Sequence, residues 1–260
     1  MKNTALITGA SSGIGKEFAR LHAKNGDDVI LVARRKQVLE ELKSELETNF
    51  GITVKVMAKD LSDLTTPQEI YNELKAEKVE VEYLINNAGF GGHGNFHERP
   101  LEKDLAMINV NVTSLMLLTK LILPDMVKRN SGRIMNVSST ASFVPGPLQA
   151  VYYATKAFVT SFSEAISEEL SDTNITVTAL CPGPIDTEFA QTGNLGNTEL
   201  FKKNKAATPK SVAEFGYTSM MKGKRVVIND KRMRLLPKVV SLFPRKMLLR
   251  ISKKTMQNVN

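Results

Sequence analysis

The sequence is poor in the residues that build disulfide-linked or metal-binding proteins. It has a single cysteine, Cys181, among 260 residues, so no disulfide can form within the chain. This composition fits a reducing compartment, and we expect a cytoplasmic protein. The three histidines, His22, His93 and His97, are scattered along the chain. Their spacing does not fit a metal site, so we expect no bound metal.

Long apolar segments are scarce as well. The N-terminal stretch MKNTALITGA has only a few apolar residues before its glycine, too few for the apolar core of a signal peptide. The longest uncharged run covers residues 134–155 and is interrupted by Pro145, Pro147 and many Ser and Thr residues. We therefore expect no transmembrane helix. The sequence also shows no internal repeat and no low-complexity segment.

The length and the order of the apolar runs predict a single α/β domain covering residues 1–260. Short runs rich in Val and Ile alternate with amphipathic stretches, which is typical of parallel strands joined by helical crossovers. We expect a doubly wound parallel sheet of about seven strands, covered by helices on both faces. The predicted strands are Thr4–Thr8, Asp28–Ala33, Ile52–Ala58, Val81–Asn86, Arg133–Ser138, Ile175–Leu180 and Arg225–Ile228. The predicted helices are Ile14–Asn25, Lys36–Thr48, Pro67–Glu77, Leu101–Arg129 and Ala150–Leu170.

The end of the chain differs in charge from the rest. Lys222–Lys254 holds twelve Lys and Arg residues and one acid, Asp230, while the whole chain has a net charge of +8. Such a segment can contact nucleic acid, anionic lipid or an acidic partner, or it can form a solvated basic face. We expect no nucleic-acid partner. We interpret residues 230–260 as a basic C-terminal extension of short, loosely attached helices, and residues 186–208 as a substrate loop.

A glycine-rich turn follows the first predicted strand and opens the first predicted helix. In the stretch GASSGIG, Gly9 permits a tight turn, Gly13 lets the backbone approach a phosphate, and Gly15 allows the helix to pack closely on the strand. The helix directs free N–H groups and the positive end of its dipole toward an anion. Strand, turn and helix in this order predict a dinucleotide phosphate site made of Gly9, Ser11, Ser12, Gly13, Ile14 and Gly15.

Tyr152 and Lys156 are spaced for acid–base chemistry. They lie four residues apart in the predicted helix Ala150–Leu170 and therefore share one face. A nearby ammonium group stabilises a phenolate and lowers a tyrosine pKa from its ordinary value of about 10. Tyr153 is three residues from Lys156, so helix geometry alone leaves both tyrosines possible.

Three motifs in this order resemble the classical short-chain dehydrogenase/reductase family. They are TGxxxGxG at Thr8–Gly15, NNAG at Asn86–Gly89 and YxxxK at Tyr152–Lys156, and the resemblance extends from Thr4 to about Thr187. It implies a Rossmann-type domain and a nicotinamide-dependent oxidoreductase that interconverts a small-molecule carbonyl and an alcohol. It also implies a homodimer or homotetramer that associates through the helices near residues 105–129 and 150–170.

The resemblance assigns roles at the reacting centre. It selects Tyr152 over Tyr153 as the proton donor, with Lys156 tuning Tyr152 and holding the nicotinamide ribose. Ser139, thirteen residues before Tyr152, matches the serine that positions the substrate oxygen, and the adjacent Ser138 is the alternative.

A proton relay is implied by the resemblance too. Asn111 matches the family's helix asparagine, which holds a water between the lysine and solvent, and Asn109 is the neighbour that could take this role. An asparagine inside a helix needs a hydrogen-bond partner, so core packing with a satisfied amide is the other interpretation.

The second strand ends in Arg34 and Arg35. Between them and Glu40 there is no acidic residue that could bind a ribose 2′-hydroxyl. Arginine suits a 2′-phosphate, so we predict NADP(H), with Arg34 the first candidate and Arg35 the second. The alternative is that both simply face solvent at the start of the next helix. Asp60 resembles the acid that binds the adenine amino group, unless it is a helix N-cap. The other predicted cofactor contacts are Leu61, Asn86, Asn87, Ala88, Gly89, Pro182, Gly183, Ile185 and Thr187.

The sequence leaves the substrate open among 3-oxoacyl groups, sugars, steroids and small diketones. An apolar pocket could involve Phe143, Leu148, Phe189 and Phe201, although generic packing explains them equally well, and His93 could touch substrate from its glycine-rich loop. One alternative function is a catalytically silent nucleotide-binding sensor or scaffold, against which the intact Ser139, Tyr152 and Lys156 argue. Another is a peripheral enzyme whose basic extension lies on an anionic membrane surface.

Overall fold

The protein forms a seven-stranded parallel sheet with the strand order β3-β2-β1-β4-β5-β6-β7, as predicted. The computed structural model describes residues 3–185, 188, 198–199 and 206–257, so most of the predicted loop 186–208 lies outside the described residues. The reversal of strand order between β1 and β4 opens a crevice at the carboxyl ends of these strands. The strands are β1 Thr4–Thr8, β2 Asp28–Ala33, β3 Val54–Ala58, β4 Tyr83–Asn86, β5 Gly132–Val137, β6 Ile175–Leu180 and β7 Val226–Val227.

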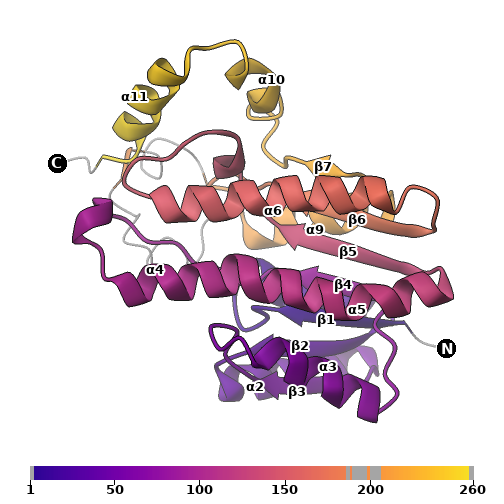
Figure 1. Cartoon of the computed structure of the whole chain (residues 1–260). Helices are drawn as coiled ribbons and strands as arrows, with labels where there is room; N and C mark the ends of the chain where they lie inside the picture. The colour runs from indigo at the N-terminus through magenta and orange to yellow at the C-terminus, as the bar shows by residue number, and fades with distance from the viewer. Residues whose placement is uncertain (1–2, 186–187, 189–197, 200–205, 258–260) are drawn as a thin grey trace.

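Helices cover both faces of the sheet, as Figure 1 shows. The α-helices are α1 Gly13–Lys24, α2 Lys36–Phe50, α3 Thr66–Ala76, α4 Leu101–Ile108, α5 Leu115–Arg129, α6 Ala150–Glu169, α9 Pro209–Met221, α10 Leu236–Val240 and α11 Arg245–Thr255. Shorter helical segments are η1 Phe96–Glu98, the π-helix η2 Asn109–Ser114 and η3 Thr140–Phe143.

The core consists of two apolar layers, one on each face of the sheet. Alternate residues of a strand point to opposite faces, so in β1 the side chain of Ile7 joins the layer under α1, α2 and α9 while Leu6 joins the layer under α3, α5 and α6. Phe18 of α1 is fully buried in the first layer, and Leu118 of α5 is fully buried in the second. This burial fixes the strand ends that carry the predicted site.

The predicted helix Leu101–Arg129 is continuous but changes its geometry in the middle, where α4 passes through the π-helix η2 into α5. By length and composition this stretch could cross a membrane, which the sequence analysis did not anticipate. In the fold one side of it packs into the core, where Met107, Leu118 and Met126 are fully buried, while Leu101 and Leu105 are exposed. π-Helical turns are rare and often lie at functional sites.

The basic C-terminal extension forms α10 and α11, which stand above the β7 side of the sheet, far from α2 and α3 (Figure 1). One face of α11 is attached to the domain, since Leu248, Ser252 and the following Met256 are buried. Met256 joins an apolar cluster with Tyr152 and Tyr153 of α6. The extension is thus built onto the helix that carries the predicted catalytic tyrosine.

Candidate active site

A cleft of about 1100 Å³ lies at the carboxyl ends of the strands. Most of the predicted site residues line it, from the glycine-rich turn at one end to the start of α6. Gly15 and Asn111 are not among the lining residues, and Thr187 lies outside the described residues. The predicted residues that line the cleft are Gly9, Ser11, Ser12, Gly13, Ile14, Arg34, Arg35, Asp60, Leu61, Asn87, Ala88, Gly89, Ser139, Tyr152, Lys156, Pro182, Gly183 and Ile185.

Asn87 locks the glycine-rich turn to the end of β4. Its amide donates to the backbone oxygen of Thr8 at 2.9 Å and of Gly9 at 3.3 Å. Gly9 has a φ of 65°, and a Cβ there would lie 2.8 Å from the Asn87 side chain. A Cβ on Gly15 would lie 2.4 Å from the Gly9 oxygen. Both glycines are therefore required for close contact between the turn, α1 and β4.

The first turn of α1 begins at the cleft. Its N-cap, Ser12, makes no side-chain capping bond, so within the described residues the usual N-cap acceptor is missing from this helix end. Arg35 lies beside this turn, with Nε and Nη2 3.3 and 3.2 Å from the Ser11 hydroxyl. Arg35 also pairs with Glu188 at 3.0 Å. The site therefore combines helix-end donors with a guanidinium group, which is a chemistry suited to phosphate.

Arg34 extends from the same strand end into solvent, with 75% of its side chain exposed. Its Nη1 lies 3.9 Å from Oδ2 of Asp60, a distance at which screening by water leaves a weak interaction. Both arginines line the cleft rather than only facing solvent. The two side chains have different partners at the cleft. Arg35 contacts Ser11, whereas Arg34 approaches Asp60.

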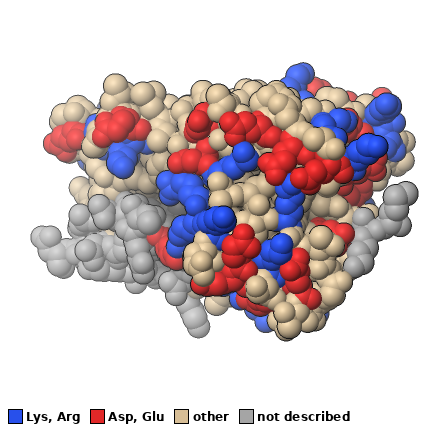
Figure 2. Space-filling model, turned by 90° about the horizontal axis from the view of Figure 1, so that it is seen from below, with Lys and Arg blue, Asp and Glu red and all other residues tan. Residues whose placement is uncertain are grey.

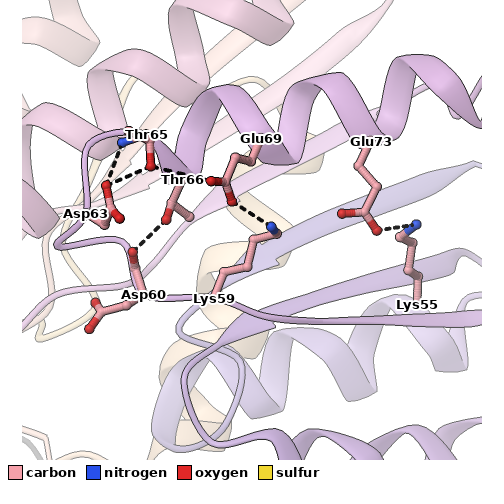
Figure 3. Close-up of polar contacts among 8 residues, drawn as sticks. All are labelled: Lys55, Lys59, Asp60, Asp63, Thr65, Thr66, Glu69 and Glu73. Carbon is pink, nitrogen blue, oxygen red and sulfur yellow. Dashed lines mark hydrogen bonds and ion pairs between the residues drawn. The ribbon is translucent and has the colours of Figure 1, made fainter.

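Asp60 is not the N-cap of α3, because Thr65 occupies that position. In Figure 3 the Asp60 backbone oxygen accepts a bond from Thr66, while its carboxylate points away from α3. The carboxylate accepts from the backbone N–H of Ser62 at 2.9 Å. Nearby, Lys59 of the same loop pairs with Glu69 of α3 at 2.8 Å (Figure 3). Asp60 therefore keeps acceptor capacity on the cleft side.

The prediction for Asn86 was wrong. Its side chain is buried beneath the cleft, where the amide donates to Asn136 at 2.9 Å and Thr119 at 3.0 Å. Asn86 is the last residue of β4 and Asn87 follows it in extended order, so their side chains point to opposite sides. Asn87 thus faces the glycine-rich turn, and Asn86 belongs to the core.

The two serines after β5 have different partners. The Ser138 hydroxyl is buried and contacts the backbone oxygen of Lys156 at 2.9 Å and Thr160 at 2.7 Å. Both serines line the cleft, but it is the Ser139 side chain that lies close to the Tyr152 hydroxyl. The geometry therefore favours Ser139, as the resemblance did.

The two tyrosines at the start of α6 are likewise distinguished by their contacts. The Tyr152 hydroxyl lies close to Ser139, whereas the Tyr153 hydroxyl lies close to Ser252 of α11. Both side chains are buried, and burial raises the pKa of each hydroxyl, to about 12 for Tyr153. Tyr152 therefore holds its proton at neutral pH, which suits a proton donor.

Lys156 is buried beside Tyr152, and its Nζ lies 5.8 Å from the centre of the Tyr152 ring. Nζ donates to the backbone oxygen of Val137 at 2.8 Å. Burial lowers the pKa of Lys156 to about 8, because the low-dielectric surroundings disfavour the ammonium form. A Cβ on Gly89 would lie 3.4 Å from this Nζ, so the small residue leaves room at the lysine.

Asn111 sits in the π-helix η2, and protein partners satisfy its side-chain amide. It donates to the Phe90 oxygen at 3.0 Å and the Thr155 hydroxyl at 3.1 Å, and it accepts from the Phe90 N–H at 3.1 Å. Asn109, the alternative, instead donates to the Ser62 oxygen. Asn111 therefore ties the loop after β4 to α6, and its relay role stays a prediction.

The loop after β4 is held at the cleft by charged and polar contacts. Arg99 pairs with the buried Asp104 and also donates to the His93 oxygen. The His93 ring contacts the backbone oxygen of Met256 at 2.7 Å, and His93 lines the cleft. His93 therefore joins this loop to the C-terminal extension.

The far end of the cleft is apolar, and the sequence analysis did not foresee which residues form it. The extension supplies most of them: Met233, Leu236, Val239, Val240, Phe243, Met247, Leu248 and Ile251. Phe143 and Leu148, two predicted candidates, are instead packed in apolar clusters outside the lining, and Phe189 and Phe201 lie outside the described residues. The amphipathic pattern of α11 was the available signal, but it indicates a buried face without saying what that face covers.

Gln149 is another cleft residue that the sequence analysis missed. It is the N-cap residue of α6, lines the cleft and is only 3% exposed. Its Nε2 has no hydrogen-bond partner among the described residues. A buried amide donor without a partner is costly. Since Gln149 precedes Tyr152 by three residues on one helix, this donor belongs to the reacting end of the cleft.

Comparison with known proteins places this site in a family. The family model described as short chain dehydrogenase matches residues 3–197. The NADP-dependent 3-hydroxy acid dehydrogenase of Schizosaccharomyces pombe is 35% identical over 236 residues, which cover 87% of this chain and 90% of that protein. The very-long-chain 3-oxoacyl-CoA reductase of Homo sapiens is 34% identical over 195 residues, but this chain covers only 61% of its length.

Solved structures agree over the whole domain. A short-chain dehydrogenase from Sphingobium yanoikuyae in complex with NADPH superposes with a TM-score of 0.84 at 28% identity, covering 99% of each chain. A 7beta-hydroxysteroid dehydrogenase gives 0.86 at 25% identity over 96% of each chain. From the match of the family model, the sheet order and the grouping of Ser139, Tyr152 and Lys156, it follows that the chain belongs to the short chain dehydrogenase family of oxidoreductases.

Proposed function

We propose that this enzyme uses NADPH to reduce a 3-oxoacyl group, or the reverse, and that the acyl chain is long and apolar. The observation that carries the proposal is the order of groups along one cleft. The glycine-rich turn and Arg35 occupy one end, Ser139 and Tyr152 the middle, and the apolar wall of the extension the other end. The activities named for the Schizosaccharomyces pombe and human relatives concern 3-hydroxy acid and 3-oxoacyl-CoA substrates, which supports the same substrate class.

The nucleotide end fits NADP(H) in its chemistry. The uncapped first turn of α1 would hold the pyrophosphate, and Arg34 and Arg35 would take the 2′-phosphate. Asp60 would accept from the adenine amino group, and Ala88 and Gly89 leave space beside Lys156. The solved relative that holds NADPH supports this choice of cofactor.

The reacting centre would work through proton donation and charge stabilisation. Bound NADPH supplies hydride to the carbonyl carbon. Tyr152, which keeps its proton because burial raises its pKa, gives that proton to the carbonyl oxygen, and Ser139 holds this oxygen in place. The Lys156 ammonium then stabilises the Tyr152 phenolate. Asn111 positions α6 and the loop after β4 around these groups.

Gln149 supplies the argument for an acyl substrate rather than a plain ketone. Its unpartnered Nε2 donor needs an acceptor oxygen close to the carbonyl that Tyr152 protonates. A 3-oxoacyl group carries a second carbonyl two carbons from the reacting one, which meets this need. Its alkyl chain would then lie against Leu236, Val240 and Leu248.

The direct test is NADPH oxidation with a panel of 3-oxoacyl thioesters of increasing chain length, together with simple ketones of matching size. We expect KM to fall as the chain lengthens, because each buried methylene contributes about 0.8 kcal/mol. Equal kcat/KM for short and long chains, or a preference for simple ketones, would contradict the substrate class. Binding of NADPH without turnover of any carbonyl would instead support a silent sensor or scaffold.

The enzyme is proposed to act as a homodimer or homotetramer in the cytoplasm. Leu105 and Ile108 of α4 and Phe158 of α6 are exposed apolar side chains on the two neighbouring helices that the family resemblance assigns to subunit contact. Sedimentation equilibrium tests the assembly, since a monomer at micromolar concentration would contradict it. The lone Cys181 is buried, and burial raises its pKa, so its thiol suits a reducing compartment.

A further inference from the structure

The C-terminal extension, residues 231–257, has an outer face that the domain does not cover. Of the large apolar side chains that are exposed in the described chain, seven lie between Leu235 and Ile251. Leu242, in the turn between α10 and α11, is 80% exposed, and Leu235 and Ile251 are 64% and 50% exposed. The surface of a soluble protein rarely concentrates apolar side chains in this way unless the patch binds a protein, a membrane or a ligand.

The charged side chains of the extension are all basic. No acidic residue follows Asp230 in the sequence, whereas nine Lys and Arg residues lie between Lys231 and Lys254, and all nine are exposed. The opposite side of the molecule differs, because around α2 and α3 Lys and Arg are interleaved with Asp and Glu (Figure 2). There, Lys55 and Lys59 form ion pairs with acids of α3 (Figure 3). The basic surplus is therefore confined to the extension.

The apolar tip and the basic groups are arranged around one point. Leu242 and Phe243 join α10 to α11, with Lys238 just before them and Arg245 and Lys246 just after. An apolar tip with cations on both sides matches an interface in which hydrocarbon lies behind a layer of anionic groups.

This face is also continuous with the substrate end of the cleft. Val239, Phe243, Met247 and Ile251 line the cleft and are exposed at the same time, so they form its mouth. A molecule that covers the outer face would therefore lie against the entrance used by an apolar substrate.

We propose that the extension docks the enzyme on an anionic phospholipid surface, with Leu242 and Phe243 inserted into the interface and the cleft mouth opening toward the lipid. A second copy of the chain is a poorer occupant, because a two-fold contact would bring two acid-free basic faces together. Nucleic acid would satisfy the charges but would leave the apolar tip in water. A lipid surface satisfies both features.

The absence of tryptophan from the chain allows a direct test. Leu242→Trp creates a single reporter at the tip, and Phe50→Trp creates a matched control on the exposed end of α2, on the opposite side of the molecule. Both are added to phosphatidylcholine vesicles with and without phosphatidylglycerol. Unchanged NADPH binding and circular dichroism show that each variant is folded.

We expect the Leu242→Trp emission to shift to the blue with phosphatidylglycerol and to be quenched by brominated lipid, while Phe50→Trp stays unchanged. Arg245→Glu with Lys246→Glu should weaken vesicle binding at least about tenfold, and salt should weaken it as well. Three results would overturn the proposal: failure to sediment with anionic vesicles at low salt, sedimentation without a change in Leu242→Trp emission, or a blue shift without vesicles that grows with protein concentration. The last would indicate that a second copy covers the face. None of these readouts depends on the substrate proposed above.

Discussion

The side chains of Ser139, two residues after β5, and Tyr152, in the first turn of α6, lie close together at the cleft. Their neighbours have other partners, since the Ser138 hydroxyl bonds the backbone of α6 and the Tyr153 hydroxyl lies close to Ser252 of α11. All four residues line the cleft, so the partner of each hydroxyl, and not access to the cleft, distinguishes the two members of each pair. Matched substitutions at these four positions separate chemistry from packing.

Replacing Tyr152 with Phe removes the proton donor while keeping the ring. We expect kcat to fall about 10²–10⁴-fold, since general acid catalysis contributes that much, with NADPH affinity nearly unchanged. Tyr153→Phe should keep activity and lose only a little stability through the Ser252 contact. Steady-state kinetics on both variants checks this, and the reverse pattern would move the proton donor to Tyr153.

Replacing Ser139 with Ala should lower kcat, because its hydroxyl lies close to the Tyr152 hydroxyl at the cleft, with only a small loss of thermal stability from the bond that it accepts from the Ala141 N–H. Ser138→Ala should do the opposite and cost about 1–3 kcal/mol of stability, since its buried hydroxyl bonds Lys156 and Thr160. Thermal melts and kinetics on the two variants give both readouts. A large loss of kcat confined to Ser138→Ala would contradict the assignment.

Arg34 and Arg35 should determine the choice between NADPH and NADH. We expect each change to Ala to weaken NADPH binding roughly 10–100-fold, the loss of one charge-assisted contact, while NADH binding is unchanged. Lys36→Ala, at the exposed start of α2, is the control. Fluorescence titration with both nucleotides measures the effect. Equal losses for NADPH and NADH would show that the arginines do not bind the 2′-phosphate.

The reduction rate should fall as the pH rises through about 8, because burial lowers the pKa of Lys156 to that value and the ammonium charge beside Tyr152 is then lost. Lys156→Met should have a low kcat at every pH and should not show the fall of kcat near pH 8. A pH profile of kcat with saturating NADPH tests the expectation. If Lys156→Met kept the same fall of kcat above pH 8, that fall would come from the titration of another group.

The same lysine should cost stability at neutral pH. Its folded pKa lies below the ordinary 10.5, so the folded state binds the proton less well than the unfolded state does. The cost is fully present below about pH 8 and disappears as the pH rises toward 10.5. Lys156→Met should therefore raise the free energy of unfolding at neutral pH by roughly 1–3 kcal/mol, seen as a higher melting temperature. This gain should shrink at alkaline pH. A gain independent of pH would indicate a packing effect instead.

Gln149 should act on substrate selection rather than on the proton transfer. Gln149→Leu fills similar space but removes the unpartnered Nε2 donor. We expect KM for 3-oxoacyl substrates to rise roughly tenfold while KM for simple ketones is unchanged. Gln149→Asn, which keeps an amide on a shorter side chain, is the companion variant. Equal effects on both substrate types would mean that Gln149 only caps α6.

The sequence by itself determined the features that depend on local periodicity and spacing. Alternating apolar runs predicted a seven-stranded parallel sheet, which the observed strand order confirms as a Rossmann-type arrangement, and three motifs predicted the family that the family model confirms. Gly9 and Gly15 could be recognised because a turn from strand to helix requires small residues at fixed positions. Tyr152 and Lys156 could be paired because a helix brings residues four apart together.

Only the tertiary structure decided the partners of each member of the neighbouring pairs and the residues that form the far end of the cleft. Asn86 and Asn87 differ by one position in a strand, and the packing of the sheet turned Asn86 into the core, against the prediction. The extension was predicted as basic and helical, yet its contribution of Leu236, Val240 and Leu248 to the cleft depends on contacts between residues about a hundred positions apart. Such contacts follow from how whole elements pack, and a local pattern of charge and apolarity does not specify the surface against which an amphipathic helix will lie.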